Sequence, residues 1–355
     1  MFIVRQYKII VNDYDKPEKI QSFIDSHWSP SHILAKNRGL FDWQYFDKTL
    51  SNYNFSIALD SFSNDIVGLL GFIPTYHFDP TLRAETDLWG AVWKVLHGTD
   101  SLTYKNGKIA GLGTSLLDHL ITTKKVRSYG AIGINKKVAR LYRYLGFSVG
   151  HLKHYYIVNQ KKSHFSILDR FNGVFCTTQT PEETHYVSLI NTQDEFNINS
   201  SPETIPVKSS LYFINRYIRH PFYDYTLLRI TNSRTESCVI VYRLVKISDS
   251  RAVRIVDFAG NPFAITGATA VFQDILQEHD AEYIDFYNYG IPEDVLKNAG
   301  FLLRGSDTSI VVPNYFEPFE RRNIDIMFAY KIFSEKPYTY TVCKGDADQD
   351  RPNLL

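Results

Sequence analysis

The sequence predicts an α/β fold with mixed sheets, built as two tandem domains of similar design, the second a degenerate copy. Three observations lead to this. Strand-like apolar runs alternate with helical patterns, and this alternation is typical of parallel strands joined by helices. The same order of elements begins again after about residue 210. A length of 355 residues also fits about two domains.

In the first half, residues 55–78 predict two strands around a Ser-Asn-Asp turn. Residues 87–96 (DLWGAVWKVL) are apolar on both faces and predict a central strand. A polar loop follows at 97–107. Leucines at helical spacing then predict a helix within 109–125, which ends in lysines.

The first half continues with a short buried strand at 128–135 and a helix at 136–145, stopped by Gly146. Residues 148–158 (SVGHLKHYYIV) predict its final strand. The predicted sheet therefore contains a parallel pair at its centre.

In the second half, two strands lie around a polar turn within 238–260, and a helix, a strand and a helix follow within 265–301. The last helix ends in Gly300-Phe301, as the first half's ends in Gly146-Phe147. Element order thus indicates an internal repeat. We predict a first domain at 1–190, a polar linker at 191–210 and a second domain at 211–355.

Charge and composition exclude several classes of function. The formal net charge is +1, so no general attraction to nucleic acid or to an anionic membrane is expected. The three cysteines lack metal or redox spacing and fit a reducing compartment. The N-terminus has no signal-peptide layout, and no apolar stretch approaches the roughly 20 residues of a membrane helix. A cytoplasmic protein without a metal is expected, either a monomer or a homodimer.

The most informative segment is Lys108-Ile109-Ala110-Gly111-Leu112-Gly113, between a strand and a helix. Glycines let the backbone approach a ligand closely. A helix N-terminus offers unpaired N–H groups and the positive end of its dipole. A pyrophosphate fits such a place, although a tight turn alone also explains the glycines.

In its motifs the chain resembles the GNAT acetyltransferase superfamily. The signature there is Arg or Gln, two residues, then G-x-G at a helix start, and here Lys108-x-x-Gly111-x-Gly113 stands in its place. Asn135 after the next strand, and a helix ending in Tyr142-x-x-Leu-Gly-Phe, match the second block. The lysine keeps the charge but loses the guanidinium fork.

The resemblance implies a transferase that binds an acyl-coenzyme A, such as acetyl- or 3-hydroxybutanoyl-coenzyme A. The glycine segment would hold the diphosphate, the central strand would pair with the pantetheine arm, and Asn135 would contact that arm. The implied coenzyme-binding residues are Val92, Lys94, Val95, Lys108, Ile109, Ala110, Gly111, Leu112, Gly113, Thr114 and Asn135.

Amine acylation needs a polarised carbonyl, a neutral amine and a stabilised thiolate. The resemblance implies that Tyr142 faces the sulfur, the alternative being a helix residue that packs on the sheet. Candidates for the base are Asp42, His220 and Asp257. Their plain alternatives are a helix cap, a turn histidine before proline and an ion pair with Arg254, and a water relay without a single base is a further alternative.

The tandem layout, the NRYIRHPFYDY segment and the C-terminal KGDADQDRPN resemble GNAT proteins of surface-polysaccharide (O-antigen) biosynthesis. That resemblance implies transfer to the amine of a nucleotide-linked amino sugar, such as a dTDP-linked 3-amino-3,6-dideoxyhexose. A cleft between the domains would gather the substrate contacts. The candidates are Trp43, Tyr45, Arg216, Arg219, Asp348, Asp350 and Arg351, and the alternative for the last three is a solvated acidic tail.

The second half lacks the glycine signature, because residues 260–268 (GNPFAITGA) contain Pro262 and no G-x-G. We therefore expect it to shape the substrate site without a second coenzyme. Three alternatives stay open: acetylation of a protein or small amine, a tRNA-dependent peptidyl transferase, which the neutral charge disfavours, and a non-catalytic acyl-coenzyme A sensor.

Overall fold

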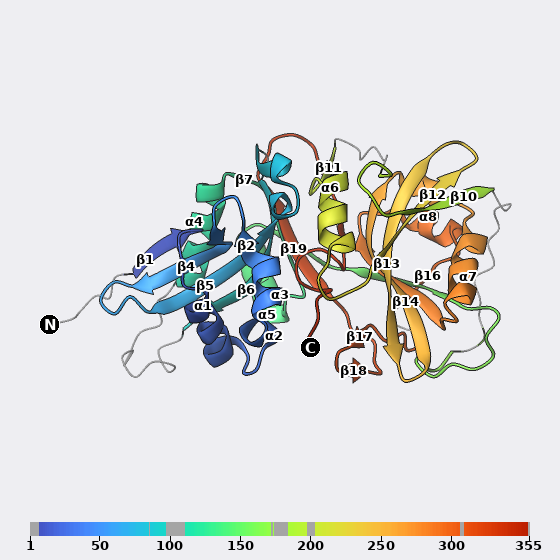
Figure 1. Cartoon of the computed structure of the whole chain (residues 1–355), viewed down its shortest axis with the longest axis horizontal. Helices are drawn as coiled ribbons and strands as arrows, with labels where there is room; N and C mark the ends of the chain where they lie inside the picture. The colour runs from blue at the N-terminus through green and yellow to red at the C-terminus, as the bar shows by residue number, and fades with distance from the viewer. Residues whose placement is uncertain are drawn as a thin grey trace. The chain divides into compact units, whose positions relative to one another are not determined.

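The structure, a computed structural model, describes residues 7–84, 86–96, 111–171, 173, 184–196, 203–305 and 309–353. Contacts divide the chain into two compact units (Figure 1). Unit 1 comprises Met1–Ala131, Lys331–Ser334 and Asn353–Leu355, and unit 2 comprises Ile132–Tyr330 and Glu335–Pro352. These units do not follow the predicted boundaries at 190 and 211, which remain a prediction about the repeat.

The strands of unit 1 lie in the order β1-β4-β5-β6-β7. Neighbours are antiparallel except β6 and β7, which are parallel. Every residue of β4 and β5 is buried, including Ser56 and Asp60 of β4. The strand bounds are β1 Tyr7–Val11, β4 Phe55–Asp60, β5 Ile66–Pro74, β6 Thr86–Val95 and β7 Val126–Ile132, with a small hairpin of β2 Phe46–Asp47 and β3 Asn52–Tyr53.

The helix predicted after the glycine segment is α4 (Leu112–Lys124). Its buried residues are the leucines at helical spacing, and the Ser56 hydroxyl of β4 donates to the Leu116 carbonyl of α4. The Asn37 side chain caps α3 by accepting from Leu40 N–H. The other helices and turns of unit 1 are α1 Pro17–Phe23, a π-helical turn Ile24–Trp28 (η1), α2 Ile33–Lys36, α3 Arg38–Tyr45 and the 3₁₀ turns Thr75–His77 (η2) and Pro80–Ala84 (η3).

The main sheet of unit 2 has the order β10-β12-β13-β14-β15-β9-β16, and β21 adds to β15. Only β14 and β15 form a parallel pair within it. The strand bounds are β9 Lys153–Val158, β10 His185–Ile190, β12 Thr226–Asn232, β13 Ser237–Ile247, β14 Ser250–Gly260, β15 Tyr283–Tyr289, β16 Leu302–Leu303 and β21 Val342–Cys343.

Helices α7 and α8 pack on this sheet, and Phe272, Leu276 and Leu296 enter one buried apolar cluster with Ile240 and Ile284. The remaining helices are α5 Lys136–Tyr144, α6 Ser210–Phe213, a π-helical turn Ile214–Ile218 (η4), a 3₁₀ turn Pro262–Ile265 (η5), α7 Thr269–Glu278 and α8 Glu293–Asn298. Two short pairs complete unit 2: β11 Thr204–Ile205 is parallel to β20 Thr339–Tyr340, and β17 Tyr315–Phe316 is antiparallel to β18 Phe319–Glu320. The antiparallel pair of β8 Ser148–His151 with β19 Met327–Ile332 continues the seven-stranded sheet, and the last two residues of β19 belong to unit 1.

The predicted repeat is present in strand order. In unit 1, β4, β5 and β6 are successive antiparallel neighbours, and a helix leads to β7, parallel to β6. In unit 2, β12, β13 and β14 are arranged in the same way, and α7 leads to β15, parallel to β14. The predicted α/β class with mixed sheets is therefore confirmed.

One predicted strand is wrong. Residues 148–158 are two strands, β8 and β9, separated by Leu152, which is buried and donates its N–H to the Ile326 carbonyl. β8 pairs with β19, whereas β9 lies between β15 and β16 in the main sheet of unit 2. The continuous run of β-favouring residues hid the break.

The later part of the predicted linker is folded. Ile205 is buried in the pair of β11 with β20, and the Lys208 side chain is 8% exposed. In this part of the predicted linker, the polar and charged residue types therefore did not indicate that the side chains are exposed to solvent.

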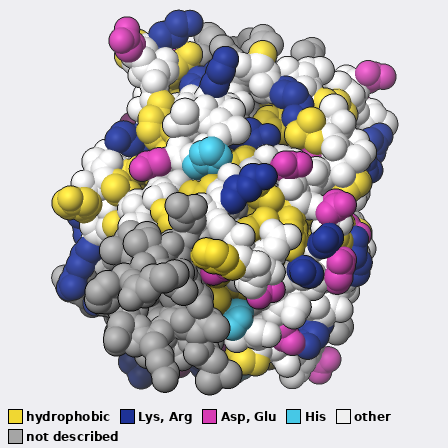
Figure 2. All heavy atoms as spheres, turned by 90° about the vertical axis from the view of Figure 1, so that its left-hand side faces the viewer, with side chains coloured by type: hydrophobic (Ala, Val, Ile, Leu, Met, Phe, Trp, Pro, Cys, Tyr) yellow, Lys and Arg dark blue, Asp and Glu magenta, His cyan; other side chains and the backbone are white. Residues whose placement is uncertain are grey.

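On the face of the molecule shown in Figure 2, basic and acidic side chains are interspersed, in keeping with the balanced formal charge. None of the helices in the described part of the chain is long and apolar enough to cross a membrane.

Gly90 of β6 leaves room for a ring of the neighbouring strand. A Cβ at this position would collide with the Tyr129 phenol of β7. We expect Gly90→Ala to lower the free energy of unfolding by about 1–3 kcal/mol, since overpacking moves well-packed groups. Urea unfolding measures the loss.

The matched control is Gly68→Ala, because the Cβ there meets the mobile end of Leu116, at 3.0 Å. Equal losses in the two variants would contradict a specific role for the contact between Gly90 and Tyr129.

Candidate functional site

The parallel strands of unit 1 separate toward their carboxyl ends. The pairing of β6 with β7 runs from Thr86↔Val126 to Gly90↔Ala131, while β6 itself continues to Val95. Val92 is buried, and Lys94 and Val95 are half-buried. The last residues of β6 therefore extend past their ladder with β7, and an extended ligand needs such main-chain groups.

Helix α4 begins beside a glycine with left-handed backbone geometry. Gly111 has φ +84° and precedes Leu112, and its carbonyl accepts from the Thr114 and Ser115 hydroxyls. Among the described residues, a Cβ on Gly111 would meet only the Thr114 hydroxyl, at 3.7 Å. Unpaired N–H groups of a first helical turn suit a diphosphate, and these residues fit one.

The predicted glycine cradle is described only in part. Gly113 lies against the Trp93 ring of β6, since a Cβ built there would be 3.5 Å from the indole. The predicted contacts Lys108, Ile109 and Ala110 lie outside the described residues. Their roles stay predictions.

Asn135 and Tyr142 belong to unit 2. The Asn135 side chain caps α5 by accepting from Lys137 N–H and Val138 N–H, at 3.0 Å each. Tyr142 is buried and its ring packs on Phe147. These contacts agree with the alternative that Tyr142 is a buried packing residue. Its contact with the sulfur of a coenzyme stays a prediction.

The base candidate Asp42 lies within α3, not at its cap, since Asn37 caps that helix. Its carboxylate accepts from Arg38 Nε at 2.6 Å and from the Tyr53 hydroxyl at 2.8 Å. Burial, and then Asp42, raise the pKa of Tyr53 to about 12. The cap alternative for Asp42 is therefore wrong, and a paired surface carboxylate takes its place.

The base candidate His220 organises a turn. Its Nδ1 accepts from Phe222 N–H at 3.1 Å and from Tyr223 N–H at 2.9 Å. Burial, and then Arg216, lower the pKa of His220 to about 3. A group of such low proton affinity is a poor general base near neutral pH, so the structure favours the turn-histidine alternative.

The base candidate Asp257 is fully buried in an ion cluster rather than paired with Arg254. Its carboxylate accepts from Lys208 Nζ at 2.5 Å and from the Tyr217 hydroxyl at 2.8 Å. Lys208 also donates to Asp346 at 3.0 Å, and Arg254 pairs with Asp285 instead. Both the base role and the predicted Arg254 pair of Asp257 are contradicted by these contacts.

Burial would lower the pKa of Lys208, but Asp257 and Asp346 outweigh it and hold that pKa well above its ordinary value. Burial, against the opposing charge of Lys208, raises the pKa of Asp346 to about 6. The cluster therefore holds a charged ammonium at neutral pH between two carboxylates.

Two predicted stacking residues of unit 1 behave differently. Tyr45 is a core residue that packs on Phe41 and Phe55 and is fully buried, so its ring has no free face for a substrate. Trp43 is half-buried against Phe78, and its carbonyl lies 2.7 Å from His77 Nε2. The prediction for Tyr45 is wrong, and that for Trp43 stays open.

The predicted diphosphate contact Arg216 is also wrong. Its guanidinium is buried and donates to the carbonyls of Gly345 and Ala347, the latter at 2.7 Å, which fixes the C-terminal segment. Arg219 is exposed and donates to Asn215 at 2.8 Å, so its role stays a prediction.

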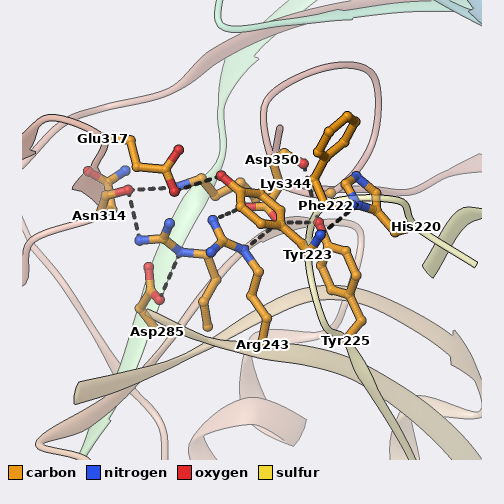
Figure 3. Close-up of polar contacts among 12 residues, drawn as sticks. His220, Phe222, Tyr223, Tyr225, Arg243, Asp285, Asn314, Glu317, Lys344 and Asp350 are labelled. Atoms are coloured by element: carbon orange, nitrogen blue, oxygen red, sulfur yellow. Dashed lines mark hydrogen bonds and ion pairs between the residues drawn. The ribbon is translucent and has the colours of Figure 1, made fainter. Parts of the chain in front are cut away.

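The C-terminal segment is folded into unit 2, contrary to the solvated-tail alternative. Figure 3 shows Asp350 beside Arg243 and Tyr225; the Arg243 fork donates to both carboxylate oxygens, at 2.9 and 3.0 Å. Burial would raise the pKa of Asp350, but Arg243 outweighs it and lowers that pKa. Asp350 is therefore engaged within the protein and is not a free sugar ligand.

Asp348 and Arg351 are half-buried, and Arg351 Nη1 donates to the Asp348 carbonyl at 3.3 Å. This contact does not test the predicted binding of a substrate by Asp348 and Arg351.

A mixed polar and aromatic pocket of about 490 Å³ lies beside this network. The Arg243 guanidinium covers the Tyr223 ring at 3.9 Å, and the Tyr223 hydroxyl donates to Glu317 at 2.8 Å (Figure 3). The lining residues are Phe222, Tyr223, Asp224, Thr226, Arg243, Leu244, Val245, Lys246, His279, Phe316 and Glu317. Such a wall suits a ligand that offers both a ring and polar groups.

Sequence reasoning missed Lys208, Arg243 and Lys344. Each is a charged residue in a strand-like or polar stretch, and its partner lies far along the chain, as for Arg243 and Asp350. Of the three, only Arg243 could have been recognised from its local sequence, because it lies within the apolar run 238–247. A charged residue in a buried strand needs an oppositely charged partner.

The gap between the parallel strands of unit 2 is filled by the chain itself. Ladder contacts of β14 with β15 end at Ile255↔Phe286. Beyond them, Gly345 N–H donates to the Val256 carbonyl and Lys344 N–H to the Tyr287 carbonyl. The C-terminal segment thus occupies the place that a pantetheine arm would need, which supports the expected degeneracy of this half.

Among the described residues, no group of three or more His, Cys, Asp or Glu side chains is placed to hold a metal ion.

Comparison with known proteins identifies the fold. The chain is similar to a GCN5-related N-acetyltransferase from Anabaena variabilis, with 10% identity over 92% of this chain and 73% of that chain and a TM-score of 0.52. It also matches a putative acetyltransferase from Pyrococcus horikoshii, with 11% identity over 96% of this chain and 95% of that chain and a TM-score of 0.45.

A third similar structure is the N-myristoyltransferase of Saccharomyces cerevisiae with bound myristoyl-CoA, with 8% identity over 95% of this chain and 82% of that chain and a TM-score of 0.44. No protein-family model and no curated protein matches the chain. At these identities, the Anabaena structure shows a fold of the GNAT type and no more.

We expect Lys344 to make the stability of unit 2 depend on pH. It is buried, donates to the Asn314 carbonyl at 2.8 Å, and burial, then Arg254, lower its pKa to about 7. The unfolded chain keeps a lysine pKa of about 10.4, so between these values only the unfolded state binds the proton. The stability of the wild type should therefore rise with pH from 7 to 9, by on the order of 2 kcal/mol relative to Lys344→Met.

Urea unfolding at several pH values measures this difference. The control Lys246→Met removes an exposed lysine of β13 and should leave the slope unchanged. Equal pH slopes for the wild type and Lys344→Met would contradict a neutral buried lysine.

Proposed function

We propose that the chain is an acyl-coenzyme A-dependent N-acyltransferase. The observation that carries this proposal is the geometry at the carboxyl end of β6. There β6 continues beyond its last residue pair with β7, and Gly111, with its left-handed backbone, directly precedes the first turn of α4. The GNAT-type fold supports the same proposal.

These elements provide the two fixed interactions that the reaction needs. Main-chain N–H groups at the end of β6 would donate to the thioester carbonyl, where negative charge develops as the amine attacks. The first turn of α4 would hold the diphosphate and so fix the position of the thioester. The C–N bond forms as the C–S bond breaks, the amine loses one proton and the thiolate gains one.

For the amine proton, we propose a water relay. Asp257 is buried and paired with Lys208, and His220 has a lowered pKa. Among the base candidates, Asp42 is the accessible one, and Arg38 and Tyr53 already donate to it. We therefore assign no single base.

For the acceptor, we propose an amine on a nucleotide-linked amino sugar. Supporting this, the pocket beside Arg243 combines aromatic rings, a threonine hydroxyl and charges of both signs, including Lys246. Sugars pack on rings and bond to such hydroxyls and carboxylates, and a lysine can bind a diphosphate as a point charge.

The experiment is release of free thiol from acetyl- and 3-hydroxybutanoyl-coenzyme A with a panel of nucleotide amino sugars, small amines and lysine peptides. We expect release with at least one nucleotide amino sugar. Release with peptides alone would reject the sugar acceptor but keep N-acyl transfer. Coenzyme binding without release on any amine would instead indicate a sensor.

The coenzyme position is tested by Gly111→Asp. A carboxylate at the start of α4 should repel the diphosphate, so binding of coenzyme A, measured by calorimetry, should weaken by at least about 100-fold. Because Gly111 is exposed and, among the described residues, its Cβ would meet only the Thr114 hydroxyl, the fold should persist.

The matched control is Gly173→Asp, which also replaces a glycine of positive φ, +79°, with no atom near its Cβ. Unchanged coenzyme binding in Gly111→Asp would place the diphosphate elsewhere.

A further inference from the structure

A second pocket of unit 2, of about 240 Å³, lies where β14 and β15 end. Ligands of open α/β sheets bind at the carboxyl ends of parallel strands, so the position itself suits a ligand. The walls come from the end of β14, the turn after β15, the C-terminal segment and residues 204–208. The lining residues are Thr204, Pro206, Val207, Lys208, Phe213, Phe258, Ala259, Gly260, Pro262, Gly290, Ile291, Pro292, Thr339, Thr341 and Cys343.

The pocket is too confined for a second coenzyme arm. Gly345 and Lys344 bond to the main chains of β14 and β15, so an extended ligand finds those groups taken. A Cβ on Gly345 would lie 2.7 Å from the Val256 carbonyl and from the Tyr217 hydroxyl, which shows how closely the segment fits. What remains is a hollow of about 240 Å³.

One buried donor belongs to this hollow. Lys208 lines it with an 8% exposed side chain, and two of its three ammonium hydrogens are engaged by Asp257 and Asp346. Within the described part of the chain, no hydrogen bond takes the third. Phe258 N–H and the Tyr217 hydroxyl also donate to Asp257, and Cys343 N–H donates to Asp346, so the cluster is held rigidly.

The charges around Lys208 select against an anion. Lys208 and Arg216 are balanced by Asp257 and Asp346. An anionic ligand would approach the ammonium but also two buried carboxylates, at a cost that low polarity enlarges. A carbonyl or hydroxyl oxygen accepts the same hydrogen without that repulsion.

The rest of the wall is mainly apolar, with Phe213, Phe258, three prolines and Val207 beside the threonine hydroxyls. We propose that this hollow binds a small uncharged ring, the size of one sugar or one pyrimidine base, with an oxygen that accepts from Lys208. The apolar edge of the ring packs on the phenylalanines, and its other polar groups meet the threonines.

Matched pairs of probes test the choice of a neutral ring. D-Fucose and D-galacturonate share one ring and differ in a methyl or carboxylate group, and 6-methyluracil and orotate differ in the same sense. Saturation-transfer NMR with the full chain should show binding of at least one neutral probe and at least tenfold weaker binding of its anionic partner. The two pairs distinguish a sugar from a base.

Val207→Trp fills the hollow from a half-buried position, so the fold should persist, as a circular dichroism melt will verify. This substitution should weaken binding of the neutral probe at least tenfold. The control Val187→Trp places the same ring on exposed β10, away from the pocket, and should leave binding unchanged.

Three results would overturn the proposal: no binding of either neutral probe, equal binding of neutral and anionic partners, or full binding in Val207→Trp. The measurement needs no acyl-coenzyme A and no turnover. Its failure would therefore leave the proposed acyl transfer untouched, and a failure of acyl transfer would leave this pocket to be judged by its own probes.

Discussion

In both units, two neighbouring parallel strands keep their ladder for only a few residues and then part. A sheet cannot leave the main-chain N–H and carbonyl groups of its diverging ends unpaired in a buried place. These groups therefore need a partner, either from the chain itself or from a ligand. In unit 1, β6 runs on to Val95 beside the start of α4, whereas in unit 2 the segment around Gly345 bonds to β14 and β15. The same fold thus yields one gap that suits an extended ligand and one that the chain closes.

Buried charges link strands of the main sheet of unit 2 to the segment that closes that gap. Lys208 joins Asp257 of β14 to Asp346 of the C-terminal segment, and Arg243 of β13 holds Asp350 with a bidentate fork. A buried pair contributes little net stability over an apolar one, but loss of a single partner is costly. These pairs therefore fix one register of the segment. They also explain how Asp346 and Asp350 of the acidic stretch DADQD lie buried instead of in solvent.

The elements that could be predicted are those whose signal is local. The spacing of the leucines predicted α4, and the apolar runs predicted β4, β5 and β6. The order of the elements predicted the repeat. Residues 148–158 failed because a run of β-favouring residues carries no mark of which sheet it joins. The break at Leu152 is set by distant partners, Ile326 for its N–H and β15 for the strand that follows.

The site shows the same limit more sharply. Arg216 and Asp350 were assigned to a ligand because a local sequence shows a charge but not what neutralises it. Their partners lie more than 100 residues away, at Ala347 and Arg243. Once those partners are counted, the charge offered to a ligand nearly vanishes around Lys208, although the residue types alone suggest a strongly charged site. Selectivity at such a place must come from hydrogen-bond direction and shape. For that reason the two hydrogen bonds that Lys208 donates, to Asp257 and Asp346, carry more information about the ligand than the composition of the whole wall.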